Sequence, residues 1–468
     1  MKSFNERSQQ AAMQSRHHSN TPYMEASNNT SNGYPKTNAA VFFAFLTYII
    51  YIYLEVGYRI PFLGEIRFQM ILGALLVLTA LPIQLSKKEK AKSGIFGWTA
   101  LLIFLMTLMT FLSADVSHSS TVYFDRVIKF SMFALMIAAF VNNPRELKWF
   151  IAAFLLACMK MGQEGFVGTI TGSMIWENQG IPRLWGSTPI YFHPNSYSGM
   201  AVGTLPFVLY MYPLVSKWFK LALLALAALA ANIIIFTGSR TGYVAVAFGV
   251  GLIIKRSKNS WKTLFWIAAI SIALIPAIPH DYLDRFDSIF TLHEKEGKSS
   301  ETRIQIIKDA WEVFKENPLG IGVGAFPIVR SQKFGRSQDT HNLYLEVATN
   351  LGIQGLITFL GFIYVLQKSL NTLQSNIETQ IKRLKEVMDR ENANDNPTYL
   401  EHVADLKWMN ATAQAVYMFI FLRLVLGLFG MDLYEIYWWF ALGLTAALLN
   451  MELHARKRTE LLTAKLQA

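Results

Sequence analysis

Apolar runs long enough to cross a bilayer recur along most of the chain and are separated by short polar stretches. A helix of about 20 apolar residues spans the hydrocarbon core, which is roughly 30 Å thick. The pattern predicts an all-α polytopic membrane protein with about twelve transmembrane helices, of which the fourth, fifth and eighth are short. The predicted spans are 39–56, 68–85, 94–112, 127–141, 147–162, 198–215, 221–237, 242–254, 263–279, 342–367, 411–429 and 434–451.

The distribution of lysine and arginine over the loops indicates the orientation of these spans. Cytoplasmic loops of membrane proteins carry an excess of Lys and Arg. With the N-terminus inside, the short outer loops hold only Arg59, Arg67, Arg126 and Arg240. The short inner loops hold twelve basic residues, and both termini are predicted to be cytoplasmic. These twelve are Lys87, Lys88, Lys90, Lys92, Arg145, Lys148, Lys217, Lys220, Lys255, Arg256, Lys258 and Lys262.

The polar segments complete the predicted organisation. Residues 1–37 are rich in Ser, Asn, Gln and Thr and are predicted to form a disordered cytoplasmic tail. Residues 280–340 form one large periplasmic loop that contains amphipathic helices, and the shorter segment 163–197 also falls outside. The predicted order after the tail is then spans one to nine at 38–279, the loop, span ten at 341–367, a cytoplasmic helical segment at 368–410, spans eleven and twelve at 411–451, and a basic cytoplasmic tail at 452–468.

Composition excludes several functional classes. The chain is 52% hydrophobic and 16% charged, whereas soluble domains have roughly 25% charged residues. The net charge of +11 does not indicate nucleic-acid binding, because the basic residues collect in short loops between apolar runs. The one cysteine, Cys158, lies in an apolar run, which excludes a disulfide framework or a cysteine-based metal site. No HExxH, Asp-x-Asp or serine nucleophile motif occurs, so neither a metal nor another cofactor is predicted.

The first candidate motif is Thr237-Gly-Ser-Arg-Thr-Gly242, which joins two spans at the predicted outer surface. Its glycines permit a tight backbone and the close approach of a ligand. Arg240 stands where the preference for inner basic residues disfavours a cation. Two interpretations stay open: the guanidinium binds an anion, or it extends to the lipid headgroups.

The second candidate is the segment 299–314, whose apolar residues repeat at helical spacing. It is predicted to form an amphipathic helix on the outer leaflet. Arg303 lies in its first turn, where the helix dipole disfavours a cation and a ligand anion would compensate. The following Gly320-Ile-Gly-Val-Gly324 lacks the context of a nucleotide-binding loop. It is predicted to be a compact turn that brings Arg303 and His341 together.

The third candidate is His341, at the point where the polar loop ends and an apolar helix begins. Asp339 or Thr340 is predicted to cap that helix, which places His341 in its first turn. The helix dipole there disfavours imidazolium, and a neutral imidazole accepts protons at neutral pH. The alternative is a histidine that only helps the helix to leave the membrane surface.

Further polar residues occur in the outer loop 163–197 and inside span eleven. Arg183, His193 and Asn195 are candidate substrate ligands, because they lie among aromatic residues that either stack on sugars or form an interfacial belt. Arg423 is a charge inside an apolar span and is therefore a candidate functional residue. It could equally extend outward.

Taken together, the three motifs resemble the O-antigen ligase and polymerase family. They are Gly-Ser-Arg-Thr-Gly at 238–242, Glu-Thr-Arg at 301–303 leading to Asn-Pro-Leu-Gly-Ile-Gly-Val-Gly-Ala-Phe at 317–326, and Thr-His-Asn-Leu-Tyr-Leu at 340–345 followed by Leu-Gly-Ile-Gln-Gly-Leu at 351–356. The resemblance covers roughly residues 180–365, and the rest of the chain matches only in hydropathy.

The resemblance implies a glycosyltransferase of the bacterial inner membrane that needs no metal. Its donor would be a glycan on undecaprenyl diphosphate at the periplasmic face, and its acceptor lipid A core or another lipid-linked glycan; a relative modifies protein. Arg240 and Arg303 would bind the diphosphate, His341 would act on the acceptor hydroxyl, and Asn342 would contact substrate. The anomeric configuration would invert. Asp339 and Glu346 are both candidates for a carboxylate that assists His341.

A polysaccharide transporter or flippase is the alternative function. Transporters bind substrates near the membrane midplane, often between repeated halves. Intramembrane charges such as Lys129, Lys160, Glu164 and Arg423 would then form the site. The motif charges are instead predicted at the outer surface and no internal repeat is evident, so the enzyme is favoured.

Overall fold

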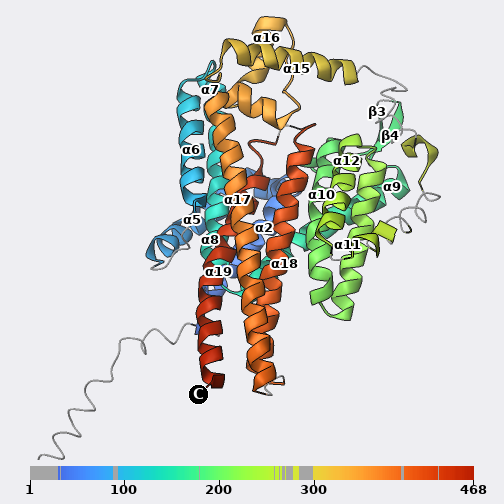
Figure 1. Cartoon of the computed structure of the whole chain (residues 1–468). Coiled ribbons are helices and arrows are strands. Elements are labelled where there is room, and N and C mark those ends of the chain that lie inside the picture. The colour runs from blue at the N-terminus through green and yellow to red at the C-terminus, as the bar shows by residue number, and fades with distance from the viewer. Residues whose placement is uncertain are drawn as a thin grey trace, which may run out of the picture.

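The computed structural model is an all-α bundle of a polytopic membrane protein, with a small two-stranded hairpin at each of two places (Figure 1). It describes residues 30–31, 33–87, 93–178, 180–257, 259–262, 264–265, 269, 278–283, 299–391, 395–430 and 432–467. Among these residues, six helices are long and apolar enough to cross a membrane. They are Phe68–Ser86, Pro144–Thr171, Lys217–Phe236, Leu343–Arg390, Pro397–Leu426 and Ile436–Lys465.

A helix occupies every predicted span except 263–279, most of which lies outside the described residues. The total of twelve spans therefore stays a prediction. Several helices are longer than their predicted spans: α9 continues to Thr171 instead of ending at 162, and α19 continues to Gln467 instead of ending at 451. The helices at the predicted spans are α2 (Ala39–Tyr53), α5 (Phe68–Ser86), α6 (Ile95–Phe111), α8 (Lys129–Phe140), α9 (Pro144–Thr171), α10 (Pro194–Met211), α11 (Lys217–Phe236), α12 (Arg240–Arg256), α17 (Leu343–Arg390), α18 (Pro397–Leu426) and α19 (Ile436–Gln467).

Side-chain caps and prolines define where several of these helices begin. Asn143 accepts a hydrogen bond from the Glu146 N–H ahead of Pro144, and Asn396 does the same for Thr398 ahead of Pro397. Proline suits the first helical position because that residue's N–H would have no partner within the helix. Both starts are therefore encoded locally by an Asn-Pro pair.

The centre of the bundle is an aromatic cluster contributed by helices far apart in sequence. Phe440 of α19 packs against Phe150 and Phe154 of α9, with ring centres 5.9 and 4.9 Å apart. It also packs against Phe207 of α10 and Phe419 of α18, at 5.9 and 5.6 Å. Such offset and edge-on ring pairs add packing energy beyond their buried area, so this cluster holds the four helices together.

The glycine turn after α15 (Ser299–Glu316) passes through a break in α17. Gly352 has φ +72 and ψ −171, which interrupts the helix between two segments. At this break the N–H of Ile353 donates to the carbonyl of Pro318 at 2.9 Å. A Cβ at Gly352 would lie 2.4 Å from the carbonyl carbon of Leu319, so only glycine allows this approach. The turn thereby fixes the end of α15 to the start of α17.

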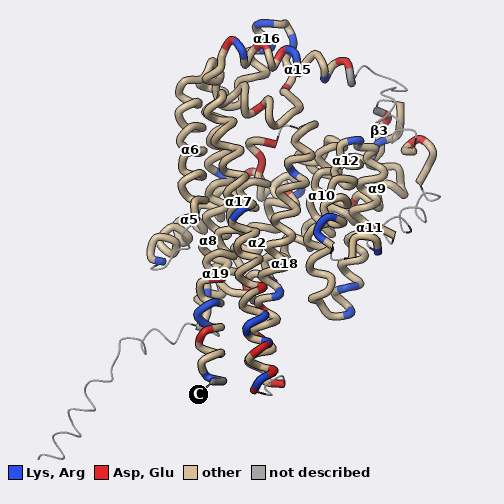
Figure 2. Tube along the Cα trace, viewed as in Figure 1, with Lys and Arg blue, Asp and Glu red and all other residues tan. Residues whose placement is uncertain are grey.

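Charged residues gather at the two ends of the molecule (Figure 2). One group lies on α15 and α16 (Phe326–Phe334), and the other on the ends of α17, α18 and α19 near the C-terminus. At that second end α17 continues to Arg390 and α18 starts at Pro397. The structure thus has an extended helical hairpin within the predicted cytoplasmic segment 368–410.

Part of the predicted disordered tail is structured. Residues Thr30–Ser31 (β1) and Tyr34–Pro35 (β2) pair as a short antiparallel hairpin. Tyr34 is only 1% exposed, and its ring centre lies 6.4 Å from that of His454 on α19. Prediction from composition missed this contact because one buried aromatic residue hardly changes the average of a polar segment. The expectation for 1–29 lies outside the described residues.

Candidate functional site

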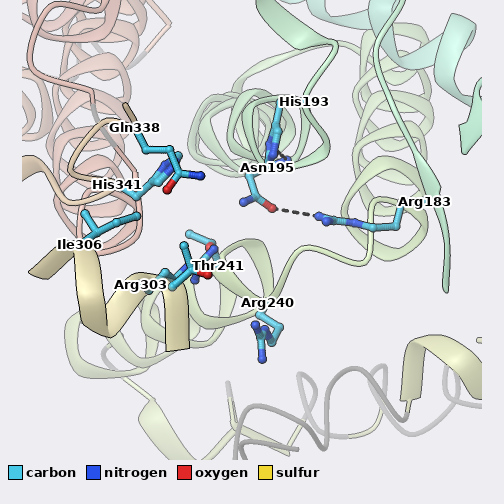
Figure 3. Close-up of a pocket in the computed structure, with 10 residues that line it drawn as sticks. Arg183, His193, Asn195, Arg240, Thr241, Arg303, Ile306, Gln338 and His341 are labelled. Carbon is cyan, nitrogen blue, oxygen red and sulfur yellow. Dashed lines mark hydrogen bonds between the residues drawn. The ribbon is translucent and has the colours of Figure 1, made fainter. Parts of the chain in front are cut away.

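A cavity of about 220 Å³ opens at the end of the bundle opposite the C-terminus (Figures 1 and 3). It brings together six of the residues singled out from the sequence, although they come from positions as far apart as 183 and 341. Three of the lining residues are arginines, two are histidines and none is a carboxylate. The lining residues are Arg183, His193, Asn195, Arg240, Thr241, Thr302, Arg303, Ile306, Gln338 and His341.

Most of the cavity wall comes from the first turns of helices. His193 is the N-cap of α10, and Arg240 is the first residue of α12. Thr302 and Arg303 lie near the described start of α15, and His341 directly precedes the N-cap of α17. Helix N-termini carry partial positive charge and free N–H groups, which favour anions. Several positive helix ends therefore surround the same space as the three arginines.

Arg183 is a buried residue of the cavity wall that holds neighbouring segments in place. It lies on β4 (Ile181–Leu184), which pairs with β3 (Ile175–Asn178). Its side chain is 3% exposed; Nε donates to the Thr237 carbonyl at 2.7 Å and Nη2 donates to Asn195 Oδ1 at 3.0 Å (Figure 3). The Ser239 hydroxyl donates to the same Asn195 oxygen at 2.9 Å. Arg183 and Asn195 thus join the starts of α10 and α12.

His193 is held as a neutral hydrogen-bond donor. Its Nδ1 accepts the Asn195 N–H at 3.2 Å, so the proton of the neutral ring sits on Nε2. Desolvation, followed by the charges of Arg183, His341 and Arg303, lowers the pKa of His193 to about 4. The imidazole therefore stays neutral at pH 7 and offers Nε2–H to a ligand.

Arg240 and Arg303 reach the cavity from two rigid helices. Ser239 caps α12 by accepting the Gly242 N–H at 3.3 Å, which directs Arg240 from the first helical position. On α15, Ile306, Ala310 and Val313 are buried in a small core with α16. The opposite residues Ile304, Ile307 and Trp311 are 54%, 45% and 53% exposed, so the predicted apolar stripe faces away from the protein.

His341 is not in the first turn of α17, as the sequence analysis expected. Asn342 is the N-cap, because its Oδ1 accepts the Leu345 N–H at 3.0 Å, and neither Asp339 nor Thr340 caps the helix. His341 instead has a left-handed backbone with φ +47. Non-glycine residues rarely adopt this conformation, and it persists only where the surrounding structure imposes it. Here it turns the chain between the loop and the helix.

The cause of the lowered His341 pKa also differs from expectation. His341 keeps exposed surface in the cavity, but the surrounding protein atoms partly desolvate its ring. This desolvation is the largest cause, and the charges of Arg303 and Arg330 act in the same direction. Asp339 raises the pKa and is the one carboxylate among these causes. The neutral imidazole predicted from the sequence is therefore supported by desolvation and neighbouring arginines.

Two predicted substrate ligands lie outside the cavity lining. Asn342 uses its amide to cap α17 and to donate to the Leu428 carbonyl at 3.0 Å. Arg423 is 3% exposed and donates from Nη2 to the Gly199 carbonyl at 3.0 Å, while Nη1 lies 3.7 Å from Asp432 Oδ2. Both side chains join segments that carry the cavity, and neither contributes to its surface.

Four lining residues were not predicted: Thr241, Thr302, Ile306 and Gln338. Thr241 and Thr302 directly neighbour the two motif arginines, which was the available signal. Ile306 and Gln338 carry none, since their position depends on how α15 and the following loop fold back. Among the described residues, no group of three or more His, Cys, Asp or Glu side chains could hold a metal ion.

Comparison with known families identifies the region that holds most of this site. Residues 224–360 match the family model described as O-antigen ligase. No curated protein matches the chain. The matched region contains Arg240, Arg303 and His341, whereas Arg183, His193 and Asn195 precede it. The match and the motifs agree on the type of protein. The match over residues 224–360 supports an O-antigen ligase-type membrane enzyme in general, similar to the O-antigen ligase and polymerase family.

Proposed function

We propose that this enzyme transfers a glycan from undecaprenyl diphosphate to an acceptor hydroxyl at the periplasmic face of the bacterial inner membrane. The observation that carries the proposal is the cavity lined by three arginines and no carboxylate, at one end of a membrane bundle. Guanidinium groups present paired donors to phosphate oxygens and keep their charge. A diphosphate on a lipid carrier is the ligand class that suits such a site.

Arg240 and Arg303 bind the diphosphate, and Nε2–H of His193 adds a neutral donor. The positive ends of the surrounding helices favour the same anion. As the glycosidic bond to the diphosphate breaks, negative charge grows on its bridging oxygen, and cations fixed in position beside it stabilise that charge. Binding and leaving-group stabilisation thus come from the same residues.

His341 accepts the proton of the acceptor hydroxyl. The acceptor oxygen bonds to the anomeric carbon, the bond from that carbon to the diphosphate oxygen breaks, and the proton goes to the neutral imidazole. The products are a new glycoside with inverted configuration, undecaprenyl diphosphate and imidazolium. Asp339 is the carboxylate whose charge acts on His341, so it stabilises the imidazolium; Glu346 instead accepts the Leu433 N–H at 3.1 Å.

The proposal uses neither a metal nor a nucleotide-sugar. A transporter would place its charged ligands near the membrane midplane. The cavity at the end of the bundle favours the enzyme over that alternative.

The acceptor decides between a ligase and a polymerase, and glycan analysis of a deletion strain tests both. Loss of surface glycan with long chains accumulating on the lipid carrier indicates a ligase. Accumulation of single repeat units indicates a polymerase. Unchanged surface glycan and unchanged carrier lipids would contradict the proposed function. Complementation with the wild-type chain is the control.

The periplasmic orientation has its own test. A cysteine introduced at Ser299 should react with a membrane-impermeant thiol reagent in intact spheroplasts, and one at Glu391 should not. Ser299 begins α15 and Glu391 follows the end of α17 at the opposite end of the molecule. The native Cys158 is 3% exposed and should contribute little background. The reverse labelling pattern would contradict the orientation.

A further inference from the structure

A buried ion pair that the sequence analysis did not single out lies behind the cavity wall. Arg330 on α16 and Asp309 on α15 are 1% and 2% exposed, and Arg330 Nε donates to Asp309 Oδ2 at 2.9 Å. Removing two charges from water is unfavourable unless good geometry and further hydrogen bonds offset the loss of hydration. Neither residue lines the cavity.

The carboxylate of Asp309 joins three segments of the outer region. Besides Arg330, it accepts hydrogen bonds at Oδ1 from Gln305 Nε2 at 2.8 Å and from Arg336 Nη2 at 3.2 Å. Gln305 belongs to α15, Arg330 to α16, and Arg336 to the segment that follows α16. Asp309 therefore fixes this segment, which continues to His341, against α15.

Arg330 carries the same network to the cavity wall. Its Nη1 donates to Gln338 Oε1 at 3.2 Å, and Gln338 lines the cavity (Figure 3). Gln338 precedes His341 by three residues, and Asp309 lies on the rigid helix that carries Arg303. A continuous path of hydrogen bonds thus runs from the helix of Arg303 to the segment of His341.

We propose that the Asp309–Arg330 pair is a positioning device that sets His341 relative to Arg303. It holds the base at the distance at which the diphosphate bound by Arg303 and the acceptor hydroxyl react together. This inference rests on the proposed function. Displacement of a catalytic group by about 1 Å can lower the rate a hundredfold. The need to position His341 accurately is therefore a sufficient reason for a buried ion pair here.

An apolar core also holds α15 against the turn before α16 and the first residue of α16. Ile306, Ala310 and Val313 of α15 form a core with Ile321, Ala325 and Phe326. Replacing a buried ion pair with apolar residues of similar size is often neutral or stabilising. The fold should therefore survive without the pair, and the loss should appear in catalysis.

The charge of Arg330 adds a second readout. Desolvation and Arg303 of α15 lower the His341 pKa, Arg330 of α16 lowers it further, and Asp339 of the same segment raises it. Across the cavity His193 of α10 is neutral at pH 7, because its pKa is about 4. Removing the Arg330 charge should therefore raise the His341 pKa.

The test compares the full-length double variant Asp309→Leu/Arg330→Met with wild type in lipid nanodiscs. The donor is the lipid-linked glycan that accumulates in the deletion strain. We expect an unchanged melting temperature, a fall in kcat of about ten- to hundredfold, little change in donor KM, and an acid limb of the rate moved to higher pH. Lys333→Met, which removes a cation from the same helix α16 where it pairs with Glu312 and Glu316, is the matched control and should change none of these.

Wild-type kcat and an unmoved acid limb in the folded double variant would overturn the inference. If the double variant fails to fold, Arg330→Lys replaces it: the charge remains, but lysine lacks the fork that contacts Asp309 and Gln338 together. It should lower kcat and leave the acid limb in place, and full kcat in this variant would also overturn the inference. If the acid limb persists in His341→Gln, the base assignment of the proposed function is wrong. The positioning role is then decided by whether the double variant lowers kcat while donor KM stays unchanged.

Discussion

Arginines occur in two contrasting settings in this molecule. At the cavity, Arg240 extends from the first residue of α12 and Arg303 from near the described start of α15, into a space with no carboxylate in its lining. Deeper in the bundle, Arg423 faces Asp432 at 3.7 Å, and its Cζ lies 3.2 Å from the ring centre of Tyr437. The first setting faces a cavity that a ligand can enter, and the second is enclosed by protein groups.

The difference shows that the role of a charged residue is indicated by the groups around it more than by its position within a membrane span. Intramembrane charge made Arg423 a functional candidate in the sequence. The structure surrounds it with a carboxylate, an aromatic face and the Gly199 carbonyl. Such a residue joins α18 to α10 and to the loop before α19. Substitutions should therefore separate the two settings: one loses activity and the other loses stability.

The largest expected effect is on transfer by the double variant Arg240→Ala/Arg303→Ala. Each guanidinium stabilises charge that develops on the leaving diphosphate, and removing one such donor typically costs a hundred- to thousandfold. We expect the double variant to lose at least about a thousandfold in transfer rate, measured with the lipid-linked glycan of the deletion strain. Its melting temperature should stay close to that of the wild type. A variant that unfolds would show that these two arginines stabilise the fold, as we infer for Arg423.

The next effect concerns His341, the neutral member of the cavity setting. His341→Ala should lower transfer by about a hundred- to ten-thousandfold, the usual loss of acid–base assistance. The imidazole must be neutral to accept a proton, and its pKa lies below the ordinary 6.5. As the pH is lowered, the wild-type rate should therefore stay constant through pH 6.5. It should fall only when the pH drops below the lowered pKa and the imidazole becomes protonated. This fall of the rate at low pH should vanish in His341→Gln. If His341→Gln or His341→Ala kept most of the wild-type rate, His341 would not be the base.

The smallest effect on chemistry and the largest on stability should come from Arg423→Met. It leaves the carboxylate of Asp432, whose side chain is 20% exposed, without its partner; the cost should approach the value of about 3–5 kcal/mol that is typical of breaking a fully buried pair. The melting temperature in detergent should fall clearly. Protein that remains folded should keep most of its affinity for inorganic diphosphate. An unaltered melting temperature with lost diphosphate binding would move Arg423 to the cavity setting.

Sequence patterns predicted the helical class and most of the site, for identifiable reasons. Hydropathy locates spans because a helix in lipid must be apolar over its length. The motifs at Arg240, Arg303 and His341 indicated the cavity because glycines and helix starts mark places where the backbone turns toward a ligand. The cap of α17 was assigned wrongly because Asp339, Thr340 and Asn342 all have capping side chains, and the left-handed turn at His341 selects Asn342.

Other features depend on tertiary structure that no local pattern encodes. The break at Gly352 exists because the chain at Leu319 passes through it. Gln338 reaches the cavity because Arg330 holds it from behind. Arg423 could not be assigned from the sequence, because its partner Asp432 lies in a loop beyond the helix end.

Binding of undecaprenyl diphosphate to purified variants tests the central claim most directly, because it separates the diphosphate site from the base. Titration of the carrier lipid into nanodisc-embedded protein should give wild-type affinity for His341→Gln, since that variant keeps both arginines. It should give strongly reduced affinity for Arg303→Ala at the same pH. Equal affinity in wild type and Arg303→Ala, or loss of binding in His341→Gln, would contradict the account of arginines that hold the diphosphate and a histidine that takes the acceptor's proton.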